Sequence, residues 1–348
     1  MPLVLMQHGG LSSLTGKTGL AMLRHRPGPI VAVIDPDHAG QRLDLVTGIA
    51  RSVPVVRNLA EALPHGPAAA VIGLAPSGGG LPDVVRADVL AALQAGLSLA
   101  SGLHSYLNDD LELQAALHPG RWIWDLRREP IGLGVGKARA AGLPCQRILA
   151  VGTDMAVGKM SACLAVHEAA ARAGVSSAFV GTGQAGILIS GQGVPLDAVR
   201  VDFAAGAVET AVLSAAQALP PEGLVLVEGQ GSLCHPGSTA TLPLLRGSQP
   251  TALMMVHRAR QSTIERLPNI PLPPLEQLVA ICESLAAIAR PAGSPAGPKV
   301  RALALNTARL DDQEASEVVE QYGERLGIPC KDPIRHGADE LLQALMTP

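Results

Sequence analysis

Aromatic residues are the scarcest feature of this 348-residue sequence, which contains only two each of tryptophan, tyrosine and phenylalanine. So few rings argue against a surface that stacks bases or sugars, and the cores must be packed from Ala, Val, Leu and Ile. Positive charge is also limited, because 27 Lys and Arg face 30 Asp and Glu for a net charge of −3, and no basic cluster stands out. Nucleic acid is therefore not an expected partner.

Paired cysteines and long apolar segments are absent as well. The five cysteines are widely separated and form no C-x-x-C pair, which disfavours a disulfide framework and a zinc site. No apolar run approaches the ~18–20 residues that cross a bilayer, and no basic-then-apolar leader opens the sequence, so a cytoplasmic protein without a membrane partner is expected. With 47% hydrophobic and 16% charged residues the chain can fill more than one core, and its alanine-rich helices favour a homo-oligomer.

Short apolar runs alternate with helical stretches along the chain, which predicts parallel sheets covered by helices on both faces. We expect two three-layer α/β domains, over residues 1–143 and 144–348. The predicted strands are Leu3–Met6, Ile30–Ile34, Val53–Val56, Ala68–Ala75, Leu97–Ala100, Arg147–Val151, Ser177–Val180, Leu224–Val227, Ala252–Val256 and Val300–Leu305. The predicted helices are His38–Arg51, Asp83–Ala95, Ser105–His118, Lys159–Ala173, Ala205–Ala218, Leu275–Ala289 and Asp312–Leu326.

The most informative segment is the glycine-containing stretch Gly152–Lys159, which joins a predicted strand to a predicted helix. This context is typical of a phosphate-binding loop (P-loop), in which backbone N–H groups surround an anion and the lysine reaches its outer oxygens. The alternative is a glycine-rich turn without a ligand. The predicted cofactor-binding residues here are Gly152, Thr153, Asp154, Ala156, Val157, Gly158, Lys159, Met160 and Ser161.

The spacing of this loop is one residue longer than the common G-x4-G-K-[ST] form and resembles the dethiobiotin synthetase-like branch of P-loop proteins. That branch has a magnesium-binding Thr where this chain has Met160, whose thioether does not ligate a hard cation. Ser161 replaces that ligand only if the helix shifts its register. The difference favours a phosphate ligand that needs no tightly held Mg²⁺, such as coenzyme A, over ATP with Mg²⁺.

A second stretch has the same spacing, Gly10-x5-Gly16-Lys17-Thr18 after the first predicted strand, and it keeps the Thr. The residues between its glycines, Leu-Ser-Ser-Leu-Thr, offer no supporting anion-loop pattern. An ordinary strand-to-helix loop is therefore favoured over a phosphate site.

Several polar groups follow predicted strands and are candidates for chemistry. Glu228 comes directly after a strand and before two glycines, so it is a candidate general base on an amine or a ligand for Mg²⁺. His235 either shares the basic role or is a turn histidine on the surface. Thr182 and Gln184 follow another strand on the same expected edge as Lys159, which makes them candidate substrate contacts.

Four further residues have both a functional and a plain structural interpretation. Asp202 opens a predicted helix and caps it by default, but with Glu228 it is a metal ligand if Mg²⁺ is used. Asn306 closes a strand and either contacts an adenine or forms a turn. Arg127 and Arg128 are a cationic pair that suits a dicarboxylate, or a solvated turn. No G-x-G-x-x-G follows the first strand, so an NAD(P) site is poorly supported.

Seven blocks of sequence together resemble one family, catalogued as the domain of unknown function DUF1611. The blocks are Val33–Gly40, Ser101–Leu107, Trp124–Arg128, Gly152–Met160, Thr182–Ile189, Asp202–Glu209 and Glu228–Pro236, and they span nearly the whole chain. The resemblance implies an N-terminal Rossmann-like domain and a C-terminal P-loop domain of the dethiobiotin synthetase-like branch.

This family includes enzymes described as D-glutamate N-acetyltransferases, which use acetyl-coenzyme A and supply an N-acetylglutamate racemase of the enolase superfamily. The resemblance implies transfer of an acetyl group from acetyl-coenzyme A to the amine of D-glutamate or a similar acidic amino acid. The candidate catalytic residues are then Glu228, His235 and Lys159, with backbone N–H groups of Gly229–Gly231 facing the oxyanion. The alternatives are an ATP- and Mg²⁺-dependent ligase or kinase, and a nucleotide-binding regulatory module without catalysis.

Overall fold

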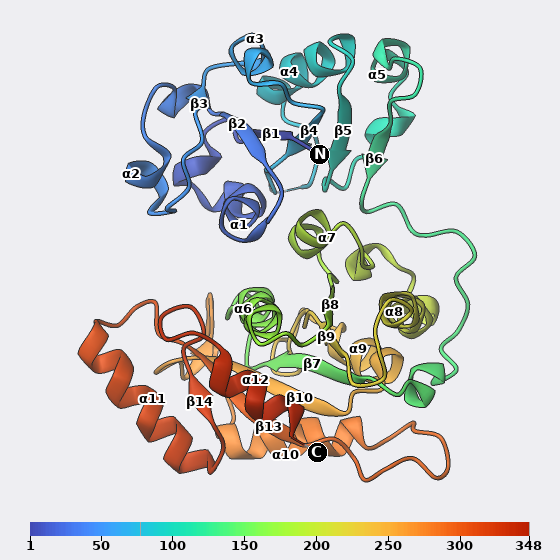
Figure 1. Cartoon of the computed structure of the whole chain (residues 1–348), viewed down its shortest axis with the longest axis vertical. Helices are drawn as coiled ribbons and strands as arrows, with labels where there is room; N and C mark the ends of the chain where they lie inside the picture. The colour runs from blue at the N-terminus through green and yellow to red at the C-terminus, as the bar shows by residue number, and fades with distance from the viewer. Residues whose placement is uncertain (77, 348) are drawn as a thin grey trace. The chain divides into compact units, whose positions relative to one another are not determined.

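The computed structural model describes residues 1–76 and 78–347, and it divides into two compact units (Figure 1). The first unit comprises Met1–Glu129 with Ile187–Gly191, and the second comprises Pro130–Gly186 with Gln192–Pro348. Residues 143 and 144, where the sequence placed the domain boundary, both lie within the second unit. Each unit contains its own parallel sheet, which confirms the α/β class predicted from the apolar strands.

The sheet of the first unit has the strand order β3-β2-β1-β4-β5-β6, and all of its neighbouring strands are parallel. Its strands are β1 (Leu3–Met6), β2 (Ile30–Ile34), β3 (Val55–Val56), β4 (Ala69–Ile72), β5 (Ser98–Ser101) and β6 (Ile123–Asp125). The helices are α1 (Lys17–His25), α2 (Leu43–Thr47), α3 (Leu59–Ala62), α4 (Asp83–Gln94) and α5 (Leu111–Ala116). This is the doubly wound order of a Rossmann-like domain.

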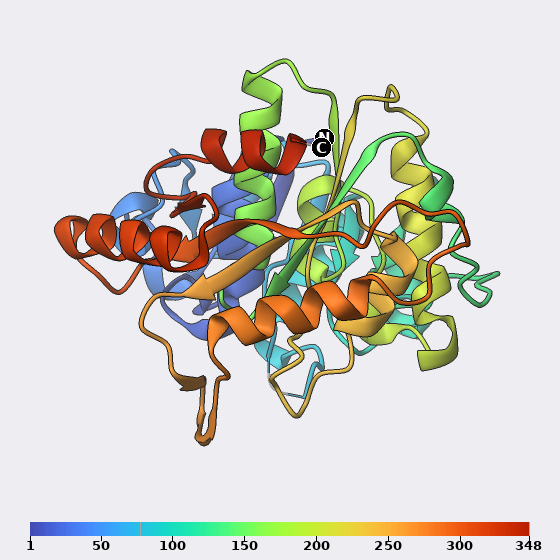
Figure 2. The same cartoon turned by 90° about the horizontal axis from the view of Figure 1, so that it is seen from below.

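The sheet of the second unit has the order β14-β13-β10-β7-β9-β8, again with only parallel neighbours. Its strands are β7 (Gln146–Gly152), β8 (Ser177–Val180), β9 (Leu224–Val227), β10 (Ala252–Arg258), β13 (Val300–Asn306) and β14 (Cys330–Lys331). A separate hairpin, β11 (Thr263–Ile264) with β12 (Leu267–Pro271), follows β10 and projects from the sheet (Figure 2).

Helices cover this second sheet because its central strands are apolar on both faces, as in β9, where all four residues are buried. The helices of the unit are α6 (Lys159–Arg172), α8 (Val201–Ala216), α9 (Thr241–Ser248), α10 (Leu275–Ala286), α11 (Asp312–Leu326) and α12 (Asp339–Met346), and α7 (Gln184–Ser190) belongs to it up to Gly186. α6 packs on α12, whereas α9 packs on both α8 and α10. No helix in the described part of the chain is both long and apolar enough to span a bilayer.

Two helices expected in the first half are wrong in extent. The helix predicted over 38–51 is only α2, because Asp35 accepts the N–H of Asp37 to cap a separate 3-10 turn, and Gly48 ends α2 with a φ of 67°. The helix predicted over 105–118 is only α5, because Asp110 accepts the N–H groups of Glu112 and Leu113 and so starts the helix there. Local capping chemistry overrides the apolar periodicity at both sites.

Glu209 on α8 holds the segment that precedes β7 in the second unit. Its side chain is fully buried and accepts hydrogen bonds from the N–H groups of Lys137 (3.1 Å) and Arg139 (2.7 Å) and from Arg139 Nε (2.8 Å). Burial alone would raise the pKa of Glu209, but these donors together lower it. The ionised Glu209 carboxylate therefore stabilises the fold at pH values above the ordinary pKa of glutamate. This stabilisation is lost as the pH falls through the lowered pKa.

Replacing Glu209 with alanine is expected to lower the free energy of unfolding by about 2–4 kcal/mol, because it leaves buried donors without an acceptor. Urea unfolding followed by circular dichroism measures the change. Glu168→Ala is the matched control, since Glu168 is an exposed glutamate on α6, and we expect it to change the free energy by less than about 0.5 kcal/mol. Equal effects of the two substitutions would show that the Glu209 contacts contribute nothing to stability.

Candidate active site

Polar residues from distant parts of the chain gather at one edge of the second sheet. β7 leads into the P-loop, β9 is followed by Glu228, β10 ends on Arg258, and β13 ends on Asn306. Because the strands are parallel, all of these carboxyl ends lie on the same side. The carboxyl end of β8, followed by Thr182, belongs to the same edge.

The P-loop has the backbone of an anion site. Gly158 adopts a φ of 114°, which favours glycine, and no side chain caps the amino end of α6. The first N–H groups of this 14-residue helix are therefore available to an external acceptor, and the helix dipole adds positive character. Met160 and Ser161 lie in the first turn of α6 and are both half-buried.

Lys159 folds back over this loop. Its side chain is buried, and its Nζ donates to the carbonyl oxygen of Asp154 at 2.7 Å. Glycines make room for it, since a Cβ on Gly152 would lie 3.1 Å from Nζ and one on Gly229 would lie 2.7 Å from Cδ. Burial lowers the pKa of Lys159 to about 8, against the opposing effect of Asp154 and Glu228. The effect of burial exceeds that of the two nearby carboxylates, so the positive charge of the buried ammonium is not fully compensated. An anionic ligand would supply the missing negative charge.

Glu228 is a buried carboxylate beside the same lysine. Its Oε2 accepts the N–H groups of Thr182 (2.8 Å) and Gly183 (3.2 Å), and its carbonyl oxygen accepts the Thr182 hydroxyl. Burial raises the pKa of Glu228 to about 7, although the two N–H donors and Lys159 act in the opposite direction. A pKa in this range suits a group that takes up and releases a proton near neutral pH.

The start of α7 lies against this carboxylate. A Cβ on Gly186 would approach Glu228 Oε2 to 2.2 Å, so only glycine fits the position without a shift. Gln184 is the first residue of α7 and is buried, two residues after Thr182. The structure therefore brings three of the sequence candidates, Thr182, Gln184 and Glu228, into one neighbourhood.

Thr153 is held from behind by a buried histidine. Its hydroxyl hydrogen-bonds Nδ1 of His257 at 2.9 Å, and Nε2 of that ring lies 3.3 Å from the hydroxyl of Tyr322. Burial, with smaller contributions from Arg325 and Arg258, lowers the pKa of His257 to about 4. The ring is neutral at physiological pH and therefore supports the loop rather than supplying charge.

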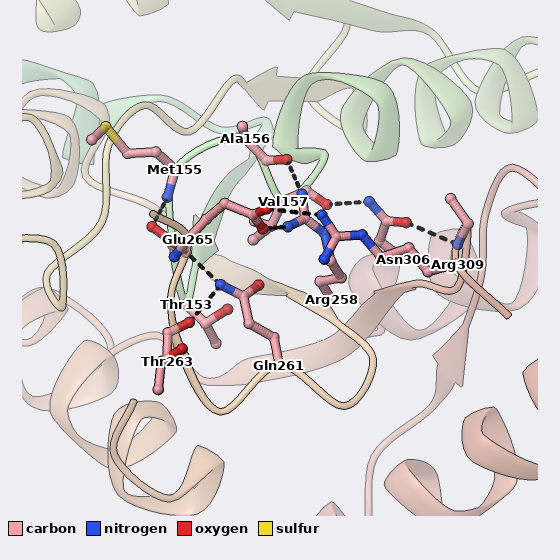
Figure 3. Close-up of polar contacts among 12 residues, drawn as sticks. Thr153, Met155, Ala156, Val157, Arg258, Gln261, Thr263, Glu265, Asn306 and Arg309 are labelled. Carbon is pink, nitrogen blue, oxygen red and sulfur yellow. Dashed lines mark hydrogen bonds and ion pairs between the residues drawn. The ribbon is translucent and has the colours of Figure 1, made fainter. Parts of the chain in front are cut away.

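Asp154 and Asn306 also bind the chain itself. The buried Asp154 carboxylate accepts the N–H of Met155 (2.6 Å), Nε2 of Gln261 (2.7 Å) and the N–H of Glu265 (2.6 Å). Nδ2 of Asn306 donates to the carbonyl oxygen of Val157 at 2.9 Å (Figure 3). These two side chains fix the shape of the P-loop, and an adenine contact by Asn306 stays a prediction.

Asp202 and His235 are the remaining candidates of this unit. Asp202 is exposed in the first turn of α8, whose N-cap is Arg200, so the expectation that Asp202 caps the helix is wrong. His235 is half-buried in a turn and accepts the N–H of Gly237 at Nδ1 (3.0 Å). Within residues 1–76 and 78–347, no three His, Cys, Asp or Glu side chains are grouped as they are around a metal ion.

The arginine pair predicted for a dicarboxylate lies in the first unit, just after β6. Arg128 donates to Asp109 Oδ1 at 2.7 Å and covers the Tyr106 ring at 4.4 Å, so its guanidinium already has a carboxylate partner. Arg127 precedes it directly. A role for either in substrate binding stays a prediction.

The second glycine loop, also in the first unit, is compact. It folds into two 3-10 turns, Gly10–Ser12 and Leu14–Gly16, before α1 begins at Lys17. A Cβ on Gly16 would lie 2.0 Å from the carbonyl oxygen of Gly10, so the two glycines are required by close backbone contact. This accounts for the glycines without a ligand.

Sequence reasoning missed a group of arginines beside the P-loop. Arg258 ends β10, the strand next to β7, and its Nη2 donates to the carbonyl oxygen of Ala156 at 2.9 Å (Figure 3). Arg309 pairs with Glu265 at 2.9 Å. The position of Arg258 at a strand end was a usable signal, but the strand was expected to end at Val256, two residues too early.

Comparisons with known families match both units. A model described as the DUF1611 P-loop domain of unknown function matches residues 134–342, and one described as the DUF1611 Rossmann-like domain of unknown function matches residues 36–129. The chain is also similar to a crystal structure of a DUF1611 family protein from Anabaena variabilis ATCC 29413, with a TM-score of 0.91 and 49% identity over 99% of each chain.

Two curated relatives carry the name D-glutamate N-acetyltransferase. One, from Tritonibacter scottomollicae, is 38% identical over 89% of this chain and 90% of its own length. The other, from a Pseudoalteromonas species, is 32% identical over 83% of this chain and 84% of its own length.

Proposed function

The chain belongs to the DUF1611 family, and on that basis we propose that it is an N-acetyltransferase that moves an acetyl group from acetyl-coenzyme A to the amine of D-glutamate or a similar acidic amino acid. The observation that carries the proposal is the pairing of Lys159, on an anion-binding loop, with a buried carboxylate, Glu228, whose pKa is about 7. The names of the two relatives support the same reaction.

The residues fit a coenzyme that carries phosphate groups. The uncapped end of α6 and the Lys159 ammonium would hold the diphosphate, and Met160 offers no oxygen for a tightly held Mg²⁺. Acetyl-coenzyme A would supply an acetyl group already activated as a thioester. The protein then has to bind the amine, remove its proton and stabilise negative charge on the carbonyl oxygen.

Glu228 is the candidate for the proton transfer. A carbon–nitrogen bond forms as the carbon–sulfur bond breaks, the amine proton passes to the Glu228 carboxylate, and the departing thiolate is protonated in turn. The Lys159 ammonium limits the rise in the Glu228 pKa, because it favours the ionised carboxylate. Backbone N–H groups of Gly229–Gly231 are candidates for the oxyanion contact, and His235 is the alternative base.

The two pKa values predict a bell-shaped pH dependence of kcat/KM. Activity is expected to rise as Glu228 ionises near pH 7 and to fall as Lys159 loses its charge above about pH 8. Initial rates with saturating amino acid and with acetyl-coenzyme A well below its KM, from pH 5.5 to 9.5 at constant ionic strength, measure the profile of kcat/KM for acetyl-coenzyme A. A rate that is flat between pH 6 and pH 8.5 would contradict these two roles.

A thiol-release assay tests the reaction itself. The pure protein is incubated with acetyl-coenzyme A and, separately, with the D and L forms of glutamate, aspartate, glutamine and alanine. Release is expected to require an acidic amino acid and to be fastest with D-glutamate. Release with none of them, together with ADP formation from Mg²⁺ and ATP, would favour a ligase or kinase; nucleotide binding without turnover would favour a regulatory module.

A further inference from the structure

A cavity of about 420 Å³ lies beside the P-loop and is lined by the segment from Arg258 to Arg266 with Pro268, Arg309 and Leu310. We propose that this cavity binds a second phosphate group of the nucleotide that the P-loop holds, namely the 3′-phosphate on the ribose of coenzyme A. The proposal extends the acetyltransferase function and rests on it. The volume suits a nucleoside phosphate.

The charge of the lining favours an anion. The lining contains four arginines, Arg258, Arg260, Arg266 and Arg309, and one acidic residue, Glu265; outside the lining, Glu314 pairs with Arg260 at 2.7 Å, so four guanidinium groups meet two carboxylates. Both oxygens of Glu265 are already used, because Oε2 pairs with Arg258 and Oε1 pairs with Arg309. Guanidinium groups match the oxygens of a phosphate in pairs, so an excess of arginine in a cavity is typical of phosphate recognition.

The cavity is joined to the P-loop through shared residues (Figure 3). Arg258 lines the cavity and also donates to the carbonyl oxygen of Ala156 in the loop. Asp154 in the loop accepts from Gln261 and from the N–H of Glu265, both of which line the cavity. A ligand held by the P-loop therefore has the arginine cavity as its immediate neighbour.

Two of the arginines occupy an unusual backbone conformation. Arg260 has a φ of 60° and Arg266 a φ of 66°, in the left-handed region that favours glycine. Arg266 stands in the turn between β11 and β12, where its side chain is exposed and has no ion-pair partner among residues 1–76 and 78–347. Arginine at a position where glycine would be unstrained is a backbone outlier of the kind found at functional sites.

The position of this charge distinguishes coenzyme A from ATP. The triphosphate of ATP is one continuous chain, which a P-loop holds by itself, and the rest of the nucleotide carries no charge. Coenzyme A has a diphosphate and, apart from it, a phosphomonoester on the ribose. Of these two nucleotides, only coenzyme A carries a separate phosphate that a second cationic site next to the P-loop can bind.

Calorimetric titration tests the site without relying on activity. Adenosine 3′,5′-bisphosphate carries both phosphate positions, and adenosine 5′-phosphate lacks only the 3′ group. The wild type is expected to bind the bisphosphate about 10–100 times more tightly, as befits one or two charge-assisted contacts. The double variant Arg260→Gln/Arg266→Gln is expected to bind both nucleotides about equally.

Arg172→Gln is the matched control, because Arg172 is an exposed, ion-paired arginine of α6 that does not line the cavity. It removes one positive charge from the same unit and is expected to keep the preference for the bisphosphate. Equal affinity of the wild type for the two nucleotides, no binding of the bisphosphate, or an undiminished preference in the double variant would each overturn the proposal.

Activity with acetyl-dephospho-coenzyme A separates this proposal from the acetyltransferase function. If the wild type acetylates amino acids equally well from both coenzymes, the cavity assignment is wrong and the function stands. If the bisphosphate preference is found but no amino acid is acetylated, the phosphate site stands and the function is wrong. The expected result is a KM for the dephospho form that is about 10-fold higher or more, with kcat little changed.

Discussion

Replacing Lys159 with alanine is expected to lower kcat/KM for acetyl-coenzyme A by about 100- to 1,000-fold, because it removes a buried, charge-assisted contact to the diphosphate. Lys159 is the buried cation of the P-loop, and its Nζ is held within the loop by the Asp154 carbonyl. Binding of acetyl-coenzyme A, measured by calorimetry, should weaken in parallel, because in the proposed site the ammonium would contact phosphate before and during the reaction.

The matched control is Lys299→Ala. Lys299 is exposed and paired with Glu283 at 2.7 Å, so its loss removes the same charge from the surface of the same unit. We expect kcat/KM to stay within about twofold of the wild type, since exposed ion pairs contribute little. If Lys159→Ala binds acetyl-coenzyme A as tightly as Lys299→Ala does, the coenzyme is not held by the P-loop.

Replacing Glu228 with glutamine is expected to lower kcat by about 100-fold or more while KM for acetyl-coenzyme A stays nearly unchanged. The amide has almost the shape of the carboxylate, and its oxygen still accepts from the N–H groups of Thr182 and Gly183, but it takes up no proton. The acid limb of the pH profile, set by the Glu228 pKa of about 7, should vanish from the residual activity.

Stability separates a catalytic role from a structural one. Because the folded-state pKa of Glu228 is raised, protonation stabilises the fold at low pH and this contribution is lost as the pH rises through about 7. The neutral glutamine should therefore not lower the Tm at pH 8.

Glu222→Gln, at an exposed loop position before β9, is the control for turnover and should keep full activity. Turnover of Glu228→Gln close to that of the control would direct attention to His235 as the base.

The sequence predicted the two parallel sheets because their strands are unbroken apolar runs. β2 and β9 have the predicted ends, and so has α11, whose start is fixed by a capping box between Asp311 and Glu314. β6 was missed because it has three residues and an exposed Trp124, as an edge strand allows. α7 was missed because Gly186 and its apolar neighbours do not show helical periodicity.

The candidate active site was predictable only in part, because the sequence marks residues beside glycines and strand ends but not contacts between distant segments. The P-loop lysine and Glu228 were predicted because glycines and strand ends mark them locally in the sequence. The engagement of Asp154 by Gln261 and Glu265 joins segments about one hundred residues apart, with sequence separations of 107 and 111. No local pattern reports such a contact, so the segment that Asp154 holds beside the P-loop was not recognised.

The most direct test of the account is the identity of the product. The protein is incubated with acetyl-coenzyme A labelled with carbon-13 in the acetyl group and with either D- or L-glutamate, and the label is followed by nuclear magnetic resonance. With acetyl-coenzyme A well below its KM, we expect an N-acetyl signal that appears with D-glutamate in the wild type and is at least about 100-fold slower in Lys159→Ala. A label that stays on the coenzyme with both enantiomers, and with the other acidic amino acids, would contradict it.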